Sequence, residues 1–414
     1  MNRFWPFREC LGMATGRAPA PVPLSCRLPA LVGLRCEVQA LLANLRVVLV
    51  GVGSIGMRIA EHFARLQVAE LWLIDSARYK PQSLITHPIH RLTNLPKATH
   101  TARLCKQISP KTRVFYFANL VQDLPLDAFA QADLCLMATD NLAAEIEVGR
   151  RCVALGKRLV QASLHGETLT AQVRVFGNAS EGPCPACGFG AIEWQQLAEQ
   201  VRYSCEGSGN GEPANALRTA LPTRSTSHLC GIGADLAVNQ SLRLALNAGE
   251  PVADTILEYC GFTNRTITAQ LERNPACRCD HARWKLVRAT TPLRQYSLAT
   301  LLDVFAGHDA DGATTVSISG ADWIEAGRCR CSDSVAVRRF VAAGHRRVGK
   351  CRRCKGVIQS QPFATCQTVT ASLLGESALI PLNRLGIKEC AWVLLRSADS
   401  GVLVQDPQRA WPEL

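Results

Sequence analysis

The 414-residue sequence contains no apolar run that approaches the ~20 residues needed to cross a bilayer. Residues 1–30 also lack a compact apolar segment followed by a cleavage site, so we expect no secretory signal. Long low-complexity runs are absent as well. Because 47% of the residues are apolar, the chain can bury a large core. We expect a cytoplasmic protein of two domains, 37–284 and 285–414, after a poorly ordered extension over residues 1–36.

Acidic residues are few relative to basic ones: 34 Asp and Glu stand against 46 Lys and Arg, which gives a net charge of +12. Such an excess can indicate a nucleic-acid partner. Here the excess is concentrated at residues 338–355, beside several cysteines. A zinc ion with four thiolates has a net charge of −2, which nearby cations stabilise. We therefore assign the excess to a metal site and expect neither a nucleic-acid nor a membrane partner.

A glycine-rich turn follows the first apolar strand. Val47–Val50 leads into Gly51-Val-Gly53-Ser-Ile-Gly56, and a helical stretch comes next. This pattern brings backbone N–H groups and a helix dipole against a phosphate, which predicts a nucleotide site. Asp75 ends the next apolar strand, nineteen residues after Gly56, where a carboxylate can accept hydrogen bonds from ribose hydroxyls.

Two later residues favour ATP over a nicotinamide cofactor. Lys97 opens a helix and supplies a cation, and Asp140 follows a strand, where its carboxylate can hold Mg²⁺ beside phosphates. Hydride transfer needs neither group. Asn141 follows directly, and we count it among the nucleotide-binding residues.

Apolar strands alternate with helical stretches over residues 46–176. This alternation predicts an α/β fold of Rossmann-like type, a mostly parallel sheet with helices on both faces. Two more strands and a helix between them complete the domain, and the second domain is predicted to be small, mixed and stabilised by zinc. The predicted strands are 47–50, 71–74, 113–117, 134–138, 159–162, 169–176, 266–271, 315–318, 357–359, 392–395 and 402–405; the predicted helices are 55–66, 98–108, 142–155 and 229–247.

Cysteines in close pairs predict two zinc sites, because in a reducing compartment such pairs are typical of metal binding. Zinc at the first set would join the start of the polar segment to the end of the first domain, and His281 is an alternative ligand to Cys279. The second set has the spacing of a zinc ribbon. The first set is Cys184, Cys187, Cys277 and Cys279, and the second is Cys329, Cys331, Cys351 and Cys354. The isolated cysteines predicted to be core are Cys36, Cys105, Cys135, Cys152, Cys230, Cys260, Cys366 and Cys390.

The order of these motifs resembles the family of ubiquitin-activating and sulfur-carrier-activating enzymes, the ThiF/MoeB type, over roughly residues 45–282. The resemblance implies that the three glycines bind the ATP phosphates, Asp75 the ribose, and Lys97 and Asp140 the triphosphate and Mg²⁺. The family also has an Asn-Leu-x-Arg run where this chain has Ser83-Leu-Ile-Thr-His87. The expected arginine is therefore missing. Either His87, His90 or Arg91 supplies the charge, or the site is weakened.

The activity implied by the resemblance is ATP-dependent adenylation of the C-terminal glycine of a small ubiquitin-like or sulfur-carrier protein. The family threads its partner's tail along a crossover loop, which corresponds to the polar segment 188–225. Cys205, the only cysteine of that segment, is the expected nucleophile for a thioester. A homodimer, a ubiquitin-conjugating-type partner enzyme and partner docking by residues 285–414 complete the expectation.

Two other functions remain open. An NAD-dependent oxidoreductase would explain the glycines and Asp75, although not Lys97 and Asp140. A catalytically weak scaffold that binds zinc and nucleic acid would explain the missing arginine and the basic cysteine module.

Overall fold

The computed structural model describes residues 36–124, 126–177, 182–198, 225–249, 252–279, 281–307, 313–342, 347–361, 364–390, 392–397 and 400–407. The predicted N-terminal extension lies almost wholly outside them. The chain divides into two compact units. The first comprises the described residues up to Val121 and Ala128–His281, and the second comprises Gln122–Asp127 and Ala282–Ala410.

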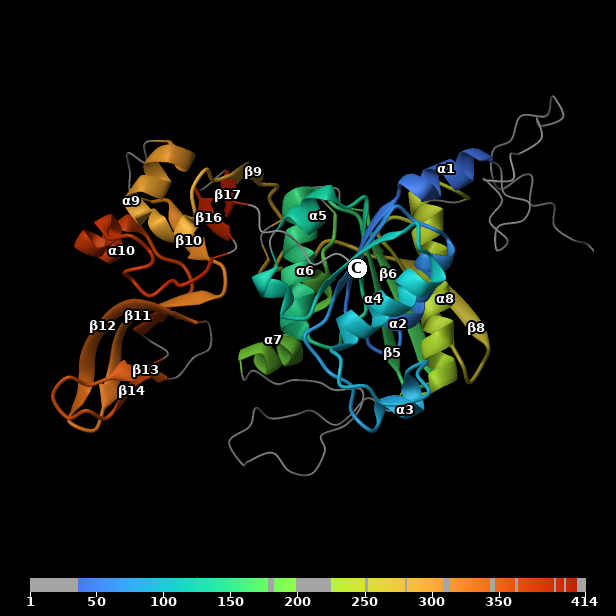
Figure 1. The fold of residues 1–414 in the computed structure, drawn as a ribbon, viewed down its shortest axis with the longest axis horizontal. Coiled ribbons are helices and arrows are strands. Elements are labelled where there is room, and N and C mark those ends of the chain that lie inside the picture. Colours follow the sequence, from blue (N-terminus) through green and yellow to red (C-terminus); the bar gives the residue numbers. More distant parts are fainter. Residues whose placement is uncertain are drawn as a thin grey trace, which may run out of the picture. The chain divides into compact units, whose positions relative to one another are not determined.

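The first unit is built on an eight-stranded sheet (Figure 1). Its strands are β1 (Arg46–Val50), β2 (Glu70–Ile74), β3 (Arg113–Phe117), β4 (Leu134–Met137), β5 (Leu159–His165), β6 (Thr170–Phe176), β7 (Thr255–Cys260) and β8 (Arg265–Gln270). They lie in the order β3-β2-β1-β4-β5-β6-β7-β8. Strands β1 to β5 are parallel, and β6 to β8 are added antiparallel. The predicted α/β class with a mixed, largely parallel sheet is confirmed.

Helices cover both faces of this sheet, as Figure 1 shows. One large core forms between the sheet and the first group of helices. A smaller apolar cluster lies on the other face. The first group is α1 (Cys36–Asn44), α2 (Gly56–Arg65), α4 (Lys97–Ile108) and α8 (Ser227–Leu246); the second face carries α6 (Leu142–Leu155), the turn η4 (Pro185–Gly188) and α7 (Ala191–Ala198); α3 (Ser83–Thr86), η3 (Val121–Asp123) and α5 (Asp127–Gln131) are short connections.

The central strands explain where the site lies. Residues 47–50 of β1 and all of β4 are buried, because helices cover both faces. Val50 pairs with Ile74 of β2 and with Met137 of β4. The residues that follow these three strands therefore meet at one edge of the sheet, the carboxyl edge at which α/β proteins bind ligands.

Three features of the structure differ from the sequence-based expectation. Strand β7 was not predicted, because its residues are only half-buried and include Glu258. Helix α7 lies inside the segment 188–225 that was predicted as a loop. Among the isolated cysteines, Cys260 and Cys366 are half-buried rather than core, and the side chain of Cys36 lies outside the described set. The core prediction is confirmed for Cys105, Cys135, Cys152, Cys230 and Cys390.

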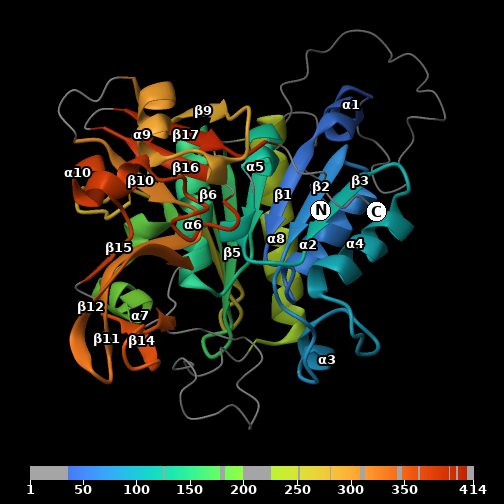
Figure 2. The same cartoon turned by 60° about the vertical axis from the view of Figure 1, so that its left-hand side comes forward.

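The second unit contains a largely antiparallel sheet (Figure 2). Its path runs β13-β14-β11-β10-β16-β17-β9, with β12 and β15 paired to β11. The strands are β9 (Lys285–Arg288), β10 (Thr315–Ile318), β11 (Ala321–Cys329), β12 (Ser332–Ala342), β13 (Arg347–Lys350), β14 (Val357–Ser360), β15 (Thr365–Cys366), β16 (Trp392–Arg396) and β17 (Gly401–Gln405). The helical turns are η5 (Leu293–Gln295), α9 (Leu298–Leu301), η6 (Leu302–Ala306), α10 (Ala371–Leu374) and η8 (Gly375–Leu379).

The hairpin of β11 and β12 was not predicted, because charged residues interrupt the alternation of apolar side chains in both strands. It pairs from Ala321 with Ala342 to Cys329 with Ser332. None of the helices in the described ranges is long and apolar enough to span a membrane.

Candidate functional site

The glycine turn lies at the carboxyl edge of the sheet. Gly51 has φ +85°, and a Cβ atom there would lie 2.5 Å from the Ala138 carbonyl oxygen. A Cβ atom on Gly56 would lie 1.9 Å from the Gly51 carbonyl oxygen. Both glycines are therefore required by the protein's own packing. A Cβ atom on Gly53 would meet nothing within 4 Å, so this glycine leaves open space in front of the turn, as close approach of a ligand requires.

Asp75 ties the end of β2 to this turn. Its Oδ2 accepts a hydrogen bond from Val52 N at 2.9 Å, and its Oδ1 accepts one from Ala77 N at 2.7 Å. Burial raises the pKa of Asp75; the positive charge of Lys97 opposes that rise and the negative charge of Asp140 adds to it. The structure thus brings the predicted charged residues Asp75, Lys97 and Asp140 within electrostatic reach of one another.

Lys97 is a buried cation, with 7% of its surface exposed. It is the first residue of α4, and its N–H donates to Ala77 O at 2.9 Å. Its Nζ lies 5.9 Å from the ring centroid of Tyr79, whose hydroxyl contacts His100 Nδ1 at 3.0 Å. Asp75 supplies a negative charge within electrostatic reach of this buried side chain.

Asp140 and Asn141 follow β4 and have different roles. The Oδ1 of Asn141 accepts hydrogen bonds from Ala143 N at 2.9 Å and Ala144 N at 3.2 Å, so this side chain caps α6. Asp140 is exposed at the same edge of the sheet as Gly51. The structure therefore gives Asn141 a structural function that the sequence-based assignment to nucleotide binding did not include.

Arg58, the third residue of α2, was missed by the sequence analysis. Its Nη2 donates to Ser227 Oγ at 2.8 Å, and its buried Nε has no hydrogen-bond partner among the described residues. Nearby, the Cys230 thiol is hydrogen-bonded to Ser54 of the glycine turn; burial raises the pKa of this thiol and the charge of Arg58 partly opposes the rise. The available signal was an arginine within one turn after the last glycine of the motif.

Of the three residues that could replace the missing arginine, only one is enclosed. His87 is buried, and its ring lies edge-on to Tyr79 with 5.6 Å between centroids. Tyr79 is the ring beside Lys97. His90 and Arg91 are exposed.

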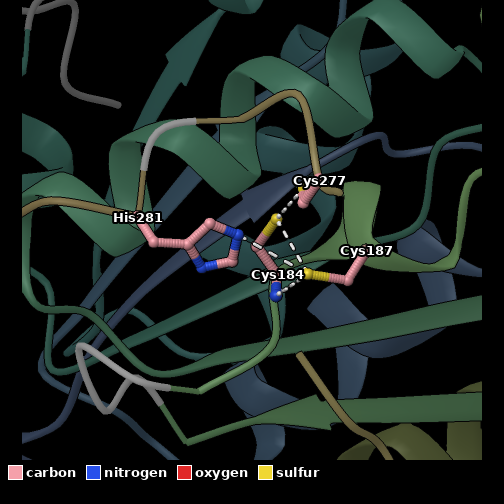
Figure 3. Close-up of side chains that lie close together, drawn as sticks. All are labelled: Cys184, Cys187, Cys277 and His281. Carbon is pink, nitrogen blue, oxygen red and sulfur yellow. Dashed lines mark hydrogen bonds between the residues drawn. The ribbon is translucent and has the colours of Figure 1, made fainter. Parts of the chain in front are cut away.

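The first cysteine set brings together donors from two distant segments, as Figure 3 shows. Donor atoms of Cys184, Cys187, Cys277 and His281 all lie within 4.8 Å of one another. Cys184 Sγ is 3.8 Å from both Cys187 Sγ and Cys277 Sγ, and Cys187 Sγ is 3.5 Å from His281 Nε2. Cys279 is not one of these four residues, although its thiol is hydrogen-bonded to that of Cys184, so the geometry favours the alternative, His281, over Cys279 as the fourth donor.

The surroundings of this group fit a metal ion. His281 Nδ1 contacts the Gly182 carbonyl oxygen at 3.2 Å, which fixes the ring with Nε2 toward the sulfur atoms. The pKa of the Cys187 thiol is raised, first by its hydrogen bond with Cys184 and then by burial. Three thiolates this close together need a bound cation to share the site.

The second cysteine set is gathered by two turns. Donor atoms of Cys329, Cys331, Cys351 and Cys354 lie within 4.8 Å of one another. The first pair is at the end of the β11–β12 hairpin, and the second lies between β13 and β14, where Cys351 N donates to Gly356 O at 2.8 Å. Backbone N–H groups of Cys354 and Arg353 hold the pKa of Cys351 at about 6, which favours the thiolate that a metal binds.

Cys205, the predicted nucleophile, lies outside the described residues, as does most of the predicted crossover loop. Within 188–225 the structure describes residues 188–198, which include α7, and residue 225. In α7, Trp194 packs against Phe189 with 5.6 Å between ring centroids, and the Glu193 carboxylate accepts from Gly190 N at 2.9 Å. These contacts explain why this polar segment begins as a helix.

The chain belongs to the ThiF family, which it matches over residues 27–279. It is 25% identical over 248 residues to the molybdopterin-synthase adenylyltransferase of Escherichia coli K12, covering 59% of this chain and 90% of that protein. It is 28% identical over 154 residues to the adenylyltransferase and sulfurtransferase MOCS3 of Drosophila grimshawi, which covers 36% of this chain but spans only 34% of that protein. A solved structure of E. coli MccB with ATP aligns with a TM-score of 0.45 at 17% identity, over 59% of this chain and 68% of MccB.

Proposed function

We propose that the protein adenylates the C-terminal carboxylate of a small ubiquitin-like or sulfur-carrier protein with ATP. The observation that carries the proposal is the electrostatically coupled set of Asp75, Lys97 and Asp140 at the edge that also holds the open side of Gly53. Membership of the ThiF family and the names of the relatives, which are adenylyltransferases, support it.

In this reaction a carboxylate oxygen of the carrier forms a bond to the α-phosphorus of ATP. The bond from that phosphorus to the bridging oxygen breaks, and pyrophosphate leaves with the electron pair. N–H groups at the glycine turn and the Lys97 ammonium hold the phosphate oxygens. Asp75 keeps the turn in place through Val52 and accepts from the ribose. Asp140 is the proposed ligand of Mg²⁺, which would neutralise charge on the phosphates.

Arg58 is our candidate for the cation that the family's Asn-Leu-x-Arg run would supply. Ser227 uses only one of the five N–H donors of its guanidinium. The remaining N–H groups, including that of the buried Nε, can donate hydrogen bonds to an anion near the turn. We expect Arg58→Ala to lower the adenylation rate about 10- to 100-fold, with Arg58→Lys recovering part of the loss.

Two zinc ions per chain are proposed, one at Cys184, Cys187, Cys277 and His281, and one at Cys329, Cys331, Cys351 and Cys354. Cys205 remains the proposed acceptor of the activated carboxyl as a thioester. A homodimer, a ubiquitin-conjugating-type partner and a cytoplasmic location belong to the same proposal.

ATP–pyrophosphate exchange with a panel of glycine-terminated β-grasp proteins tests the function. We expect exchange that depends on one such protein, and a loss of at least 100-fold in Asp140→Ala. Asp235→Ala is the matched control, because this exposed carboxylate of α8 pairs only with His62, at 2.8 Å, among the described residues. Undiminished exchange in Asp140→Ala would remove this residue from the mechanism. A fluorescence titration that detects NADH binding but no ATP·Mg²⁺ binding would overturn the function itself.

The thioester step has its own test. Wild type with ATP, Mg²⁺ and the cognate carrier should form a covalent adduct that thiol reductant releases. Cys205→Ala should lose the adduct and keep pyrophosphate exchange. An adduct that persists in Cys205→Ala would exclude this cysteine, and its absence from wild type would indicate direct transfer from the adenylate.

A further inference from the structure

Basic side chains surround the second cysteine group. Two arginines flank Cys329, two lie between Cys351 and Cys354, and lysines stand on either side of this second pair. Because the four sulfur atoms lie within 4.8 Å of one another, the two turns that carry these cations are adjacent, and the Arg330 side chain lies beside Gly356 of the second turn. All six are exposed: Arg328, Arg330, Lys350, Arg352, Arg353 and Lys355.

The charge exceeds what a metal site needs. The described residues of 321–361 contain nine exposed Lys and Arg residues against three acidic ones, Asp322, Glu325 and Asp333, a net charge of +6. A zinc ion with four thiolates contributes −2, which leaves +4. The sequence-based explanation, that the cations compensate the zinc site, therefore accounts for only part of the excess.

These cations have few acidic partners. Arg338 Nε pairs with Glu325 Oε1 at 2.9 Å. Within the part of the chain that the structure describes, none of the six cations at the cysteine turns forms an ion pair. A metal–thiolate group would relieve part of their mutual repulsion, and solvent, salt or an external anion relieves the rest.

The surface formed by the described residues of 321–361 is charged and has little exposed apolar area. Trp323 and Phe340 are buried, at 1% and 2% exposure, and Val357 is the only exposed large apolar side chain among the described residues of 321–361. Protein interfaces need a desolvated, largely apolar centre, and single-stranded nucleic acid is held by exposed aromatic rings. Neither is present there. Arginines at high density instead match phosphates, which they bind in a bidentate manner.

We propose that this basic face, formed by the six cations at the two cysteine turns, binds the phosphate backbone of duplex nucleic acid without reading its sequence. The binding is a second function of the chain, beyond the proposed adenylation. Phosphate contacts supply affinity and salt dependence, and the absence of exposed aromatic groups predicts no preference for a base.

The test uses the full-length, zinc-loaded protein and a fluorescein-labelled 20-base-pair DNA duplex of mixed sequence, followed by fluorescence anisotropy. If about four phosphates are contacted, affinity should fall roughly 100-fold between 50 and 200 mM NaCl. Arg352→Ala/Arg353→Ala should weaken binding at least 10-fold and reduce the slope of log K against log salt by about 2. The matched control is Lys111→Ala/Arg265→Ala, two exposed cations of the first unit, which should change neither.

Four measurements decide the result: zinc content, ATP binding, duplex binding and binding of an acidic peptide. Zinc content and ATP binding should be unchanged in Arg352→Ala/Arg353→Ala, which separates this inference from the proposed adenylation. Absence of duplex binding at 50 mM NaCl, or equal loss in the control variant, overturns the proposal. Equal affinity for a polyglutamate 20-mer also overturns it, because the face would then be a site for acidic proteins.

Discussion

The two cysteine groups lie in different structural settings. The first joins η4 to a turn more than ninety residues later, in a unit that already has an extensive core. The second lies among β11 to β14, beside a local cluster of four buried residues, Ile324, Val348, Cys351 and Ile358, that is separate from the larger core of the second unit. A metal ion at the first group would therefore lock a fold that the core of the unit already stabilises, whereas at the second it would supply free energy that the small local cluster lacks.

Removal of a ligand from the second group should have the largest effect. In Cys351→Ser, we expect loss of one zinc ion per chain and loss of hydrogen-exchange protection across β11 to β14, because a small core cannot replace the metal. The first unit should keep its ATP affinity. Atomic emission measures the zinc content, and hydrogen exchange measures the protection of the strands. Full hydrogen-exchange protection in Cys351→Ser would show that these strands fold without metal. The two cysteine groups would then not differ in this respect.

The first group should tolerate a ligand change with a smaller structural loss. We expect His281→Ala to lower the zinc content from two to one and to loosen the connection between η4 and residue 277, while β1 to β5 stay protected. Cys279→Ala is the matched control and should retain two zinc ions, because Cys279 lies outside the group of converging donors. Zinc loss in Cys279→Ala but not in His281→Ala would restore the sequence-based ligand set.

Buried charge gives the first unit a pH dependence of its own. Burial raises the pKa of Glu145 to about 7, although Gln161 Nε2 donates to its Oε2 at 2.9 Å. The unfolded chain releases this proton near its ordinary pKa of 4.5, so stability falls as pH rises from about 4.5 to 7. Glu145→Gln should remove this fall and add up to about 3 kcal/mol to the free energy of unfolding at about pH 8.

Urea denaturation of wild type and Glu145→Gln across that pH range measures the effect. The two proteins should differ little near pH 4.5 and most above pH 7. A difference that is constant with pH would show that Glu145 does not titrate in this window. Hydrogen exchange in β11 to β14 should be the same in both proteins, because Glu145 belongs to the first unit.

The smallest structural effect is expected at Gly53. A methyl group there meets no protein atom within 4 Å, so Gly53→Ala should change stability by no more than about 0.5 kcal/mol. It should nevertheless weaken ATP binding about 10-fold, since the methyl group occupies the ligand side of the turn. Gly56→Ala, which would clash with the Gly51 carbonyl oxygen, should destabilise the unit. Unchanged ATP affinity in Gly53→Ala would place the phosphates elsewhere.

The bounds of many elements in the first unit could be predicted from the sequence, because they depend on residues that are neighbours along the chain. Strand β3 and helix α6 have the predicted bounds, Arg113–Phe117 and Leu142–Leu155. The buried strands of the first unit are continuous apolar runs. Helix α6 begins after its cap residue, Asn141, and ends before Gly156, which has φ +70°. Strand β7 and the β11–β12 hairpin gave no such signal, since charged and apolar residues mix along them and their pairing depends on neighbours.

The sequence by itself determined the glycine turn, the alternation of strands and helices over residues 46–176, and the close cysteine pairs, because these follow from residue type and spacing along the chain. Tertiary structure decided which residues come together where spacing along the chain allows more than one arrangement. Cys279 and His281 follow Cys277 by two and four residues, so either could be a ligand, and the path of the turn brings His281 into the group. Arg58 and Ser227 are 169 positions apart, and the 2.8 Å contact between their side chains exists only because α2 and α8 pack on the same face of the sheet.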